Sequence, residues 1–225
     1  MYNMKRPLSS TKAKSERTYS GISISERIAF RKAQFVEVGI ELFGTIGYQA
    51  TTMRLLTAKT GLTNRYFYES FSNLEDLLVA SYEKLMDDFR TRLQLVLTDA
   101  NEQTDPALRI RPGLVCFFEA MKNPKFARIT HTEVLGVSER VDRLYSRNTA
   151  DFASLMMEHL TSSISHPLLL SNTQMQYIGA ALTGSLINSA MVWVNSKYEI
   201  SIEEIVDVTL NVFVGTVSQF TGAKA

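Results

Sequence analysis

Helix-start signals recur along almost the whole chain, and they constrain the fold more than any other feature. A serine followed three residues later by Glu or Gln can form a capping box, as in Ser23/Glu26, Ser72/Glu75, Ser171/Gln174 and Ser201/Glu204. Asp105-Pro106 and Asn123-Pro124 are cap-then-proline starts. No segment shows sustained period-two alternation. We therefore predict an all-α protein with helices near residues 26–45, 52–59, 63–70, 73–101, 106–121, 124–135, 138–164, 171–196 and 201–220.

The first three predicted helices are short and are separated by sharp turns. Gly47 ends the first helix as a C-cap glycine would, and Thr51 or Thr52 caps the second. Gly61 permits the left-handed backbone of a tight turn, and Thr63 can cap the third helix. This spacing predicts a helix-turn-helix, which holds its second helix in the major groove of DNA.

The first turn of the third helix carries side chains suited to base recognition. Arg can donate two hydrogen bonds to guanine and Asn can pair with adenine, so Asn64, Arg65 and Tyr66 are the candidates for reading bases. Six residues around them suit contacts with phosphates: Thr52, Arg54, Lys59, Thr63, Tyr68 and Asn73. Phe67 and Phe71, four residues apart, are interpreted as core aromatics that pack on the first helix.

Charge is distributed unevenly along the chain. Residues 1–72 contain 11 Lys and Arg against 5 Asp and Glu, a net charge of +6, whereas residues 73–225 carry a net charge of −5. A basic N-terminal third on an acidic remainder is typical of a nucleic-acid reader joined to another unit, although a disordered basic tail gives the same asymmetry. We expect a flexible basic tail over residues 1–24, a helix-turn-helix domain over 25–73 and an effector-binding and dimerisation domain over 74–225.

Residues 26–80 resemble the TetR-type transcriptional regulators of bacteria. The resemblance rests on a set of residues in the family's order and spacing: Leu42-Phe43, Gly47-Tyr48, Thr51-Thr52, Gly61-Leu62, Phe67-Tyr68, Phe71, Glu75, Leu77 and Leu78. It implies a homodimer that represses transcription and leaves its DNA operator when a small molecule binds. It also implies DNA contacts by Arg54, Asn64, Arg65, Tyr66 and Tyr68.

Three residues depart from the family's pattern. Leu74 stands where the family often has a lysine that contacts a phosphate, so that contact is in doubt. Thr57 and Thr60 replace alanines, and their hydroxyls can bond backward to helix carbonyls without a change of fold.

Residues 80–165 are rich in Phe, Leu and Met at helical spacing. In the resembled family this region encloses the effector pocket, and such side chains line adaptable apolar cavities well. The candidate pocket residues are Phe89, Leu93, Phe117, Phe118, Met121, Phe152 and Met156; the alternative is that they form an ordinary helical core. The sequence names no effector, and we expect a small hydrophobic molecule.

The last two predicted helices are apolar, and residues 167–196 contain no charged side chain. Family members dimerise through these helices, and small residues let helices approach closely. The candidate interface residues are Ala181, Gly184, Ser185, Trp193, Val212 and Phe213; the alternative is burial within one subunit. Residues 178–194 are long enough to suggest a membrane span, but polar residues interrupt them and a buried or interfacial helix fits better.

Other classes of function have little support in the sequence. We find no nucleophile elbow, P-loop, dinucleotide fingerprint or HExxH pattern, so we predict no enzyme and no cofactor. One cysteine, Cys116, and scattered histidines lack metal-ligand spacing, so no metal site is predicted. No secretion signal is visible, and we expect a cytoplasmic protein. The alternative function is an effector-independent DNA- or protein-binding factor of the nucleoid on the same fold.

Overall fold

The computed structural model describes residues 23–100, 105–162 and 170–220, and within them it contains nine α-helices, one π-helical turn and no strand. The elements are α1 (Ile24–Thr45), α2 (Met53–Thr60), α3 (Asn64–Tyr68), α4 (Leu74–Asp99), α5 (Pro106–Met121), α6 (Pro124–Arg128), the π turn η1 (Ile129–Glu133), α7 (Glu139–Thr161), α8 (Asn172–Asn195) and α9 (Ile202–Ser218). The all-α prediction is confirmed. The helix predicted over residues 124–135 is instead divided, because α6 widens into η1.

Most predicted helix starts occur where the sequence places them. The capping boxes at Ser23, Ser171 and Ser201 are formed, and Asp105 and Asn123 cap helices that begin with proline. The box predicted for Ser72 with Glu75 is wrong by one residue. Asn73 Oδ1 accepts the backbone N–H of Asp76 at 2.9 Å, and the Asp76 carboxylate accepts the N–H of Ser72 at 2.9 Å. Asn caps a helix as well as Ser does, so Asn73 can serve as the N-cap in place of Ser72.

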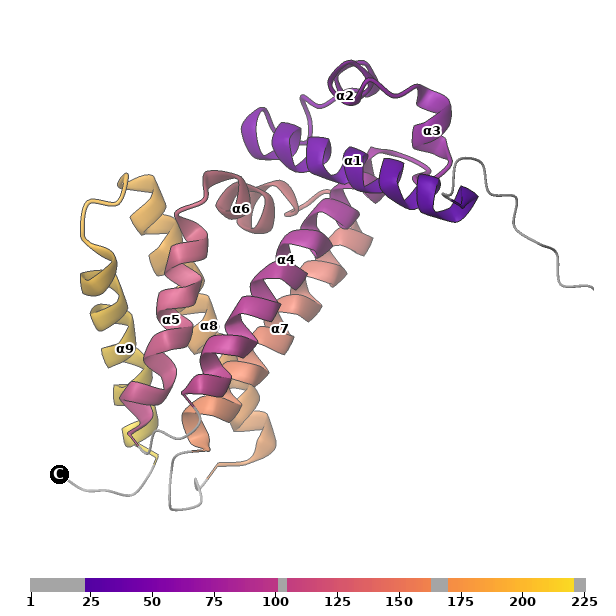
Figure 1. Cartoon of the computed structure of the whole chain (residues 1–225). Helices are drawn as coiled ribbons and strands as arrows, with labels where there is room; N and C mark the ends of the chain where they lie inside the picture. Colours follow the sequence, from indigo (N-terminus) through magenta and orange to yellow (C-terminus); the bar gives the residue numbers. More distant parts are fainter. Residues whose placement is uncertain (1–22, 101–104, 163–169, 221–225) are drawn as a thin grey trace, which may run out of the picture.

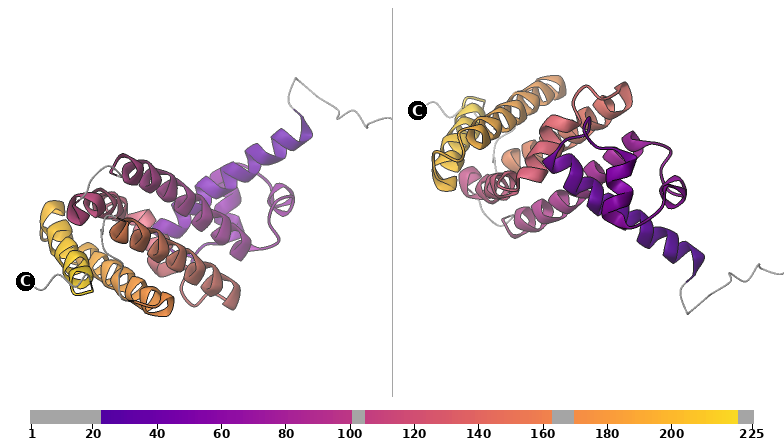
Figure 2. Two further views of the ribbon diagram at one scale, coloured as in Figure 1. Left: turned by 90° about the horizontal axis from the view of Figure 1, so that it is seen from below. Right: turned by 90° about the horizontal axis from the view of Figure 1, so that it is seen from above.

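The helices form a small head on a larger body (Figure 1). Helices α1, α2 and α3 make up the head, and α4 runs from the head down through the body beside α5 and α7. Helix α9 packs against α5 at the edge of the body, and α6 lies beneath α1. Figure 2 shows the same division from below and from above, with α1 projecting away from the body.

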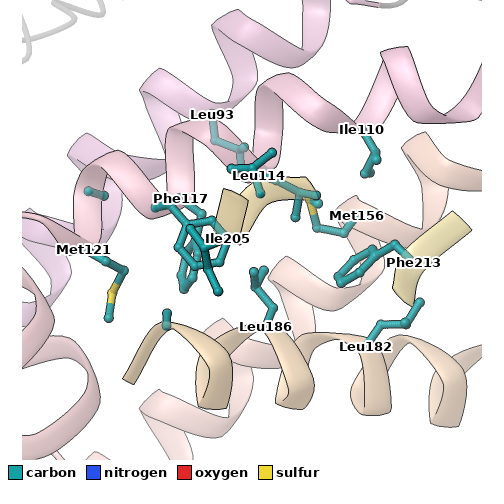
Figure 3. Packing of buried hydrophobic residues seen from close by; sticks show 14 of the residues in the cluster. Leu93, Ile110, Leu114, Phe117, Met121, Met156, Leu182, Leu186, Ile205 and Phe213 are labelled. Carbon is teal, nitrogen blue, oxygen red and sulfur yellow. The ribbon is translucent and has the colours of Figure 1, made fainter. Parts of the chain in front are cut away.

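Two hydrophobic cores meet on α4. The head core contains Phe35, Phe43, Leu77 and Tyr82, together with Ile129 of η1 and further buried residues. The body core begins at Phe89 on the same helix and continues through α5, α7, α8 and α9; Figure 3 shows how its side chains interdigitate. Leu85 and Met86 contact both cores, so α4 joins head and body through packed side chains. A part of the chain far from the N-terminus, η1, therefore completes the head core.

The head rests on α6 through a close contact at Gly44. A Cβ at this position would lie 2.5 Å from Lys125 Cβ and 2.9 Å from Lys125 Cα. Only glycine permits α1 and α6 to approach this closely, because heavy atoms at such distances overlap.

Two predictions concern the ends of the chain and its apolar helix. Residues 1–22 of the predicted tail lie outside the described residues, and α1 begins at Ile24, within the predicted range of that tail. Among the described residues, α8 is the one helix long and apolar enough to be considered a membrane span, with 33% of that segment buried. Tyr177 and Val192 of this helix are 75% and 61% exposed.

Candidate DNA-binding surface, contacts between head and body, and effector cavity

Aromatic packing fixes the position of α3 on the head. Phe67 is fully buried and its ring stacks edge-on against Phe35 of α1, with centroids 5.4 Å apart. Phe71 packs against the same Phe35 ring at 6.5 Å. Both residues are core aromatics, as predicted from their spacing. Because these rings face inward, the opposite side of the short helix is turned to solvent.

The turn between α2 and α3 has helix-turn-helix geometry. Thr52 caps α2 by accepting the Leu55 N–H at 3.3 Å, which decides between the two threonines proposed from the sequence. Gly61 ends α2 with φ of +69°, in the left-handed region that glycine adopts without strain. Thr63 occupies the N-cap of α3, but its side chain makes no capping hydrogen bond. Its hydroxyl is therefore not used within the helix.

The candidate base-reading residues differ in how far their side chains are exposed. Arg65 has 86% of its side chain exposed and lies 3.9 Å from Glu69 one turn later. Tyr66 is half-buried, and the Arg31 guanidinium sits 4.3 Å above its ring centroid. Arg31 is itself held by Glu69 at 2.7 Å. Sequence reasoning missed this cluster of Arg31, Tyr66 and Glu69, because 38 residues separate its two charged members.

The candidate phosphate-binding residues are unequally placed. Thr52, Arg54, Thr63 and Tyr68 are exposed around the head's outer side, Tyr68 at 60%. Lys59 Nζ lies 4.0 Å from Glu41 Oε1. The side-chain oxygen of Asn73 already accepts a hydrogen bond as the N-cap of α4. Glu75 and Asp76 add two carboxylates at the start of α4, where a phosphate would meet negative charge. Their contacts with DNA remain predictions, with Lys59 and Asn73 the least favoured by geometry.

The first turn of α4 is also connected to α7. Arg140 bonds the Asp76 carboxylate at 2.7 Å, and this pairing lowers the pKa of Asp76 below its ordinary value. Leu74, which stands where the resembled family often has a lysine, is the first residue of α4. The polar groups of the residues around it already have hydrogen-bond partners within the protein.

Polar contacts from α6 and η1 hold the turn after α1. Glu133 accepts the backbone N–H of Tyr48 at 2.7 Å and the Nε–H of Arg128 at 2.7 Å. Arg128 also donates to the carbonyl of Thr45 at 2.5 Å, and Lys125 pairs with Glu41. The Glu133 side chain is 13% exposed. Since 85 residues separate Glu133 from Tyr48, no local sequence signal indicates the contact.

Replacement of Glu133 by alanine is expected to loosen the head from the body. The change leaves the Tyr48 N–H and the Arg128 guanidinium without their acceptor, so the free energy of unfolding should fall by about 1–3 kcal/mol. Chemical denaturation followed by circular dichroism measures the loss. Glu139→Ala is the matched control, because Glu139 is 91% exposed and pairs only with an exposed arginine. Equal stability of the two variants would contradict a structural role for Glu133.

The body contains a small, partly open cavity between α4, α5, α6, α7, α8 and η1, which we call the inner cavity. Its volume is about 30 Å³, enough for a water molecule or two. Aromatic rings form most of its wall, from Tyr82, Phe89, Phe117, Phe126, Tyr145 and Phe152. An open depression of about 200 Å³ between α4 and α7, the outer groove, shares Met86, Phe89, Asn148 and Phe152 with it.

The predicted pocket residues fall into two groups. Phe89, Phe117 and Phe152 line the inner cavity, and Leu93 lines the outer groove. Phe118, Met121 and Met156 line neither; they are at most 2% exposed and fill the body core, where Figure 3 shows Met121 and Met156. They lie in the body core, as the alternative of ordinary helical packing expects, and a contact between these three residues and an effector stays a prediction. Helical spacing does not distinguish a side chain that faces a cavity from one that meets a neighbour.

His131 is a residue of the inner cavity that the sequence did not single out. Its Nδ1 is buried and has no hydrogen-bond partner among the described residues, and its ring stacks edge-on with Phe117. Burial lowers the pKa of His131 to about 4, so the ring is neutral near pH 7.

The predicted dimer residues also divide. Ala181, Gly184 and Val212 are exposed, and a Cβ on Gly184 would meet nothing within 4 Å. Ser185 is half-buried and donates to the Leu182 carbonyl at 2.7 Å. Trp193 and Phe213 are 3% and 1% exposed, inside the body core of one subunit. Their rings pack against neighbouring helices of the same chain, as the alternative of burial within one subunit expects, and a role of these two residues at a subunit interface stays a prediction.

Comparisons with known proteins agree with this geometry. Residues 35–80 match the family model described as bacterial regulatory proteins, tetR family. The fatty acid degradation regulator FadR from Bacillus halodurans has a similar structure, with TM-score 0.67, 15% identity and coverage of 82% of this chain and 95% of that one. FadR from Bacillus subtilis, solved in complex with stearoyl-CoA, gives TM-score 0.67 and 14% identity over 81% of this chain and 97% of that one.

Another solved structure has a lower TM-score but a higher sequence identity. A transcriptional regulator of the TetR/AcrR family from Thermobifida fusca YX-ER1 gives TM-score 0.57 and 21% identity, covering 87% of this chain and 100% of that one. No curated protein matches the chain in sequence.

The head and its exposed third helix have the geometry of a helix-turn-helix, and the nine helices of the described residues have the all-α fold of the solved structures compared above. Residues 35–80, which lie in the head and the start of α4, match the model of the tetR family of bacterial regulatory proteins. The resemblance read from the sequence is confirmed.

Proposed function

We propose that this protein is a homodimeric, sequence-specific DNA-binding regulator, and that it acts as a repressor released from its operator by a small hydrophobic effector. The observation that carries the proposal is the exposed first turn of α3, where Asn64 and Arg65 extend from a helix anchored by Phe67. Side chains of this kind on a rigid, outward-facing helix are what reading of base edges requires.

Dimerisation supplies the second reading head. The outer face of α8 and α9 is lined by small or apolar exposed residues: Tyr177, Ala181, Gly184, Val192, Val208, Val212 and Gly215. Cβ atoms on Gly184 and Gly215 would meet nothing within 4 Å, so the backbone of a partner's helix can approach there. A two-fold dimer through this face would set two α3 helices about 34 Å apart or at a longer spacing on the same DNA face.

Release of DNA follows from a shift between two arrangements of head and body. An effector in the inner cavity would act on α4, which crosses both cores, and on η1, which carries His131 and Glu133. A ligand shifts such an equilibrium only by its difference in affinity for the two states. FadR from Bacillus subtilis was solved in complex with stearoyl-CoA, so that molecule is included among those tested.

Selection of bound sequences from a random DNA pool tests the proposal. A short palindrome recovered by the full-length protein supports it. Binding that depends on DNA length and not on sequence would overturn it in favour of a nucleoid-associated role. A screen of small molecules for release of the selected DNA then tests the effector.

Arg65→Ala is expected to weaken binding to the selected operator by about 1–3 kcal/mol and to relax preference at one base pair. Fluorescence anisotropy measures the affinity, and the thermal midpoint should hardly move because the side chain is 86% exposed. Arg143→Ala is a matched control, since Arg143 is 72% exposed and also pairs with a glutamate one turn away. Unchanged affinity of the Arg65 variant would refute its role in base reading.

A further inference from the structure

The inner cavity contains a polar group that the protein leaves without a partner. His131 Nδ1 is buried and unbonded within the described part of the chain, at the wall of a cavity that is otherwise mostly aromatic. Thr183, only 1% exposed, adds a hydroxyl to the same wall. A buried polar atom without a hydrogen bond destabilises a protein. The buried hydroxyls of Ser70 and Ser81 also have no partner among the described residues, but His131, unlike them, lines a cavity, so a bound molecule is a candidate partner for its Nδ1.

The wall of the inner cavity is uncharged. The described residues that line it include no Asp, Glu, Lys or Arg, and His131 is neutral near pH 7 because burial lowers its pKa. A carboxylate or phosphate at this depth would lose its hydration and find no cation. The buried end of any occupant must therefore be uncharged.

The outer groove offers a route to this cavity. The two spaces share Phe89 and Phe152 as a common wall, and a hydrogen bond of 2.9 Å from Arg90 to Asn148 Oδ1 crosses between α4 and α7 at the boundary. Arg90 is also held by Asp87, so charged groups lie at the outer end of the route and only neutral groups at the inner end.

We propose that the inner cavity and the outer groove together bind a compact, uncharged aromatic molecule whose hydroxyl group hydrogen-bonds to His131 Nδ1. This inference rests on the proposed function and specifies the effector class at the same site. A hydroxyl both donates and accepts, so it satisfies either neutral tautomer of the histidine. The outer groove, at about 200 Å³, compares with the roughly 150 Å³ cavity that accommodates benzene in an engineered protein. The ring would lie against Phe89, Phe117 and Phe152.

The proposal excludes two other chemistries. A long acyl chain exceeds the space, and the carboxylate of an aromatic acid has no cation to meet at His131. Three probes of similar shape therefore discriminate: 4-ethylphenol, ethylbenzene and 4-ethylbenzoate. Stearoyl-CoA serves as the fourth probe.

Isothermal titration of the free, full-length protein measures the four affinities. We expect 4-ethylphenol to bind about tenfold more tightly than ethylbenzene, with 4-ethylbenzoate the weakest of the three. In His131→Leu the preference for the phenol over ethylbenzene should vanish. His131→Asn, which keeps a polar atom near the position of Nδ1, should restore part of it.

NMR of the unmodified protein tests the contact with His131 without relying on a variant that folds. The chain has three histidines, so selective ¹⁵N labelling of histidine gives few imidazole signals. In the unmodified protein, 4-ethylphenol should shift the signals of one ring and ethylbenzene should not. Equal affinities of phenol and ethylbenzene, tighter binding of 4-ethylbenzoate or stearoyl-CoA, or an unchanged phenol preference in a folded His131→Leu protein would each overturn the proposal.

Failure of this inference is distinguishable from failure of the proposed function. Ligand affinity is measured without DNA, and operator affinity is measured without ligand. Intact palindrome binding with no phenol preference refutes the ligand class alone. Phenol binding at His131 in a protein that recognises no DNA sequence refutes the regulator and leaves the site.

Discussion

Trp193→Ala is expected to lower the free energy of unfolding by about 3–5 kcal/mol, as truncation of a buried aromatic does. The Trp193 ring is 3% exposed and stacks edge-on with Phe118 at 5.6 Å and with Tyr198 at 4.8 Å. Its indole N–H donates to the Ile200 carbonyl at 2.7 Å and so closes the turn between α8 and α9. Urea denaturation followed by far-ultraviolet circular dichroism measures the loss at a fixed protein concentration.

Trp193→Phe separates the contributions of ring packing and hydrogen bond. It keeps much of the aromatic surface and leaves the Ile200 carbonyl without the indole donor, so a smaller loss is expected than for alanine. A Trp193→Ala protein that unfolds at the original urea concentration but becomes monomeric would reverse the interpretation. Such a result would return Trp193 to the subunit interface.

Val212→Arg is expected to weaken dimerisation by about 100-fold or more. Val212 is 46% exposed on α9, so the subunit alone can accommodate the longer side chain. In a two-fold interface the substitution occurs on both copies, and each arginine would be buried without a partner at a cost of about 3 kcal/mol or more. Sedimentation equilibrium measures the dissociation constant, and circular dichroism should show unchanged helix content.

Leu95→Arg provides the matched control for that experiment. Leu95 is 63% exposed on α4, away from the face of α8 and α9. Replacing this exposed apolar side chain by arginine should therefore leave the dimer intact. Dimers of equal strength in both variants would mean that subunits do not meet through Val212. Monomers in both would indicate that added charge disrupts the fold and not the interface.

The head was largely predictable because its signals are local. Thr52, Gly61 and the Phe67–Phe71 spacing each specify a cap, a turn or a buried face within a few residues of themselves. The shift of the α4 cap from Ser72 to Asn73 lies within this local chemistry, since either residue can cap a helix. The 86% exposure of the Arg65 side chain agrees with its place in the first turn of the predicted third helix.

The body was predictable only in outline. Apolar periodicity indicates that a side chain such as Met156 or Phe213 lies on the inner face of a helix, but it does not say what covers that face. Whether the covering is a cavity, a neighbouring helix or a second subunit depends on helices far away in the sequence. Phe118, Met121, Met156, Trp193 and Phe213 lie in the body core of one subunit, which apolar spacing alone does not distinguish from a pocket or an interface.

By itself the sequence determined that the chain is helical, where most of its helices begin to within a few residues, and that its head presents Asn64 and Arg65 on a turn-bounded helix, because propensity, caps and glycine turns act over a few residues. Only the tertiary structure decided how head and body are joined. Glu133 reaches Tyr48 across 85 residues, and Gly44 lets α1 rest on α6. It also decided that His131 lines a cavity without charged side chains, since burial is a property of everything packed around a residue and not of its neighbours in the chain.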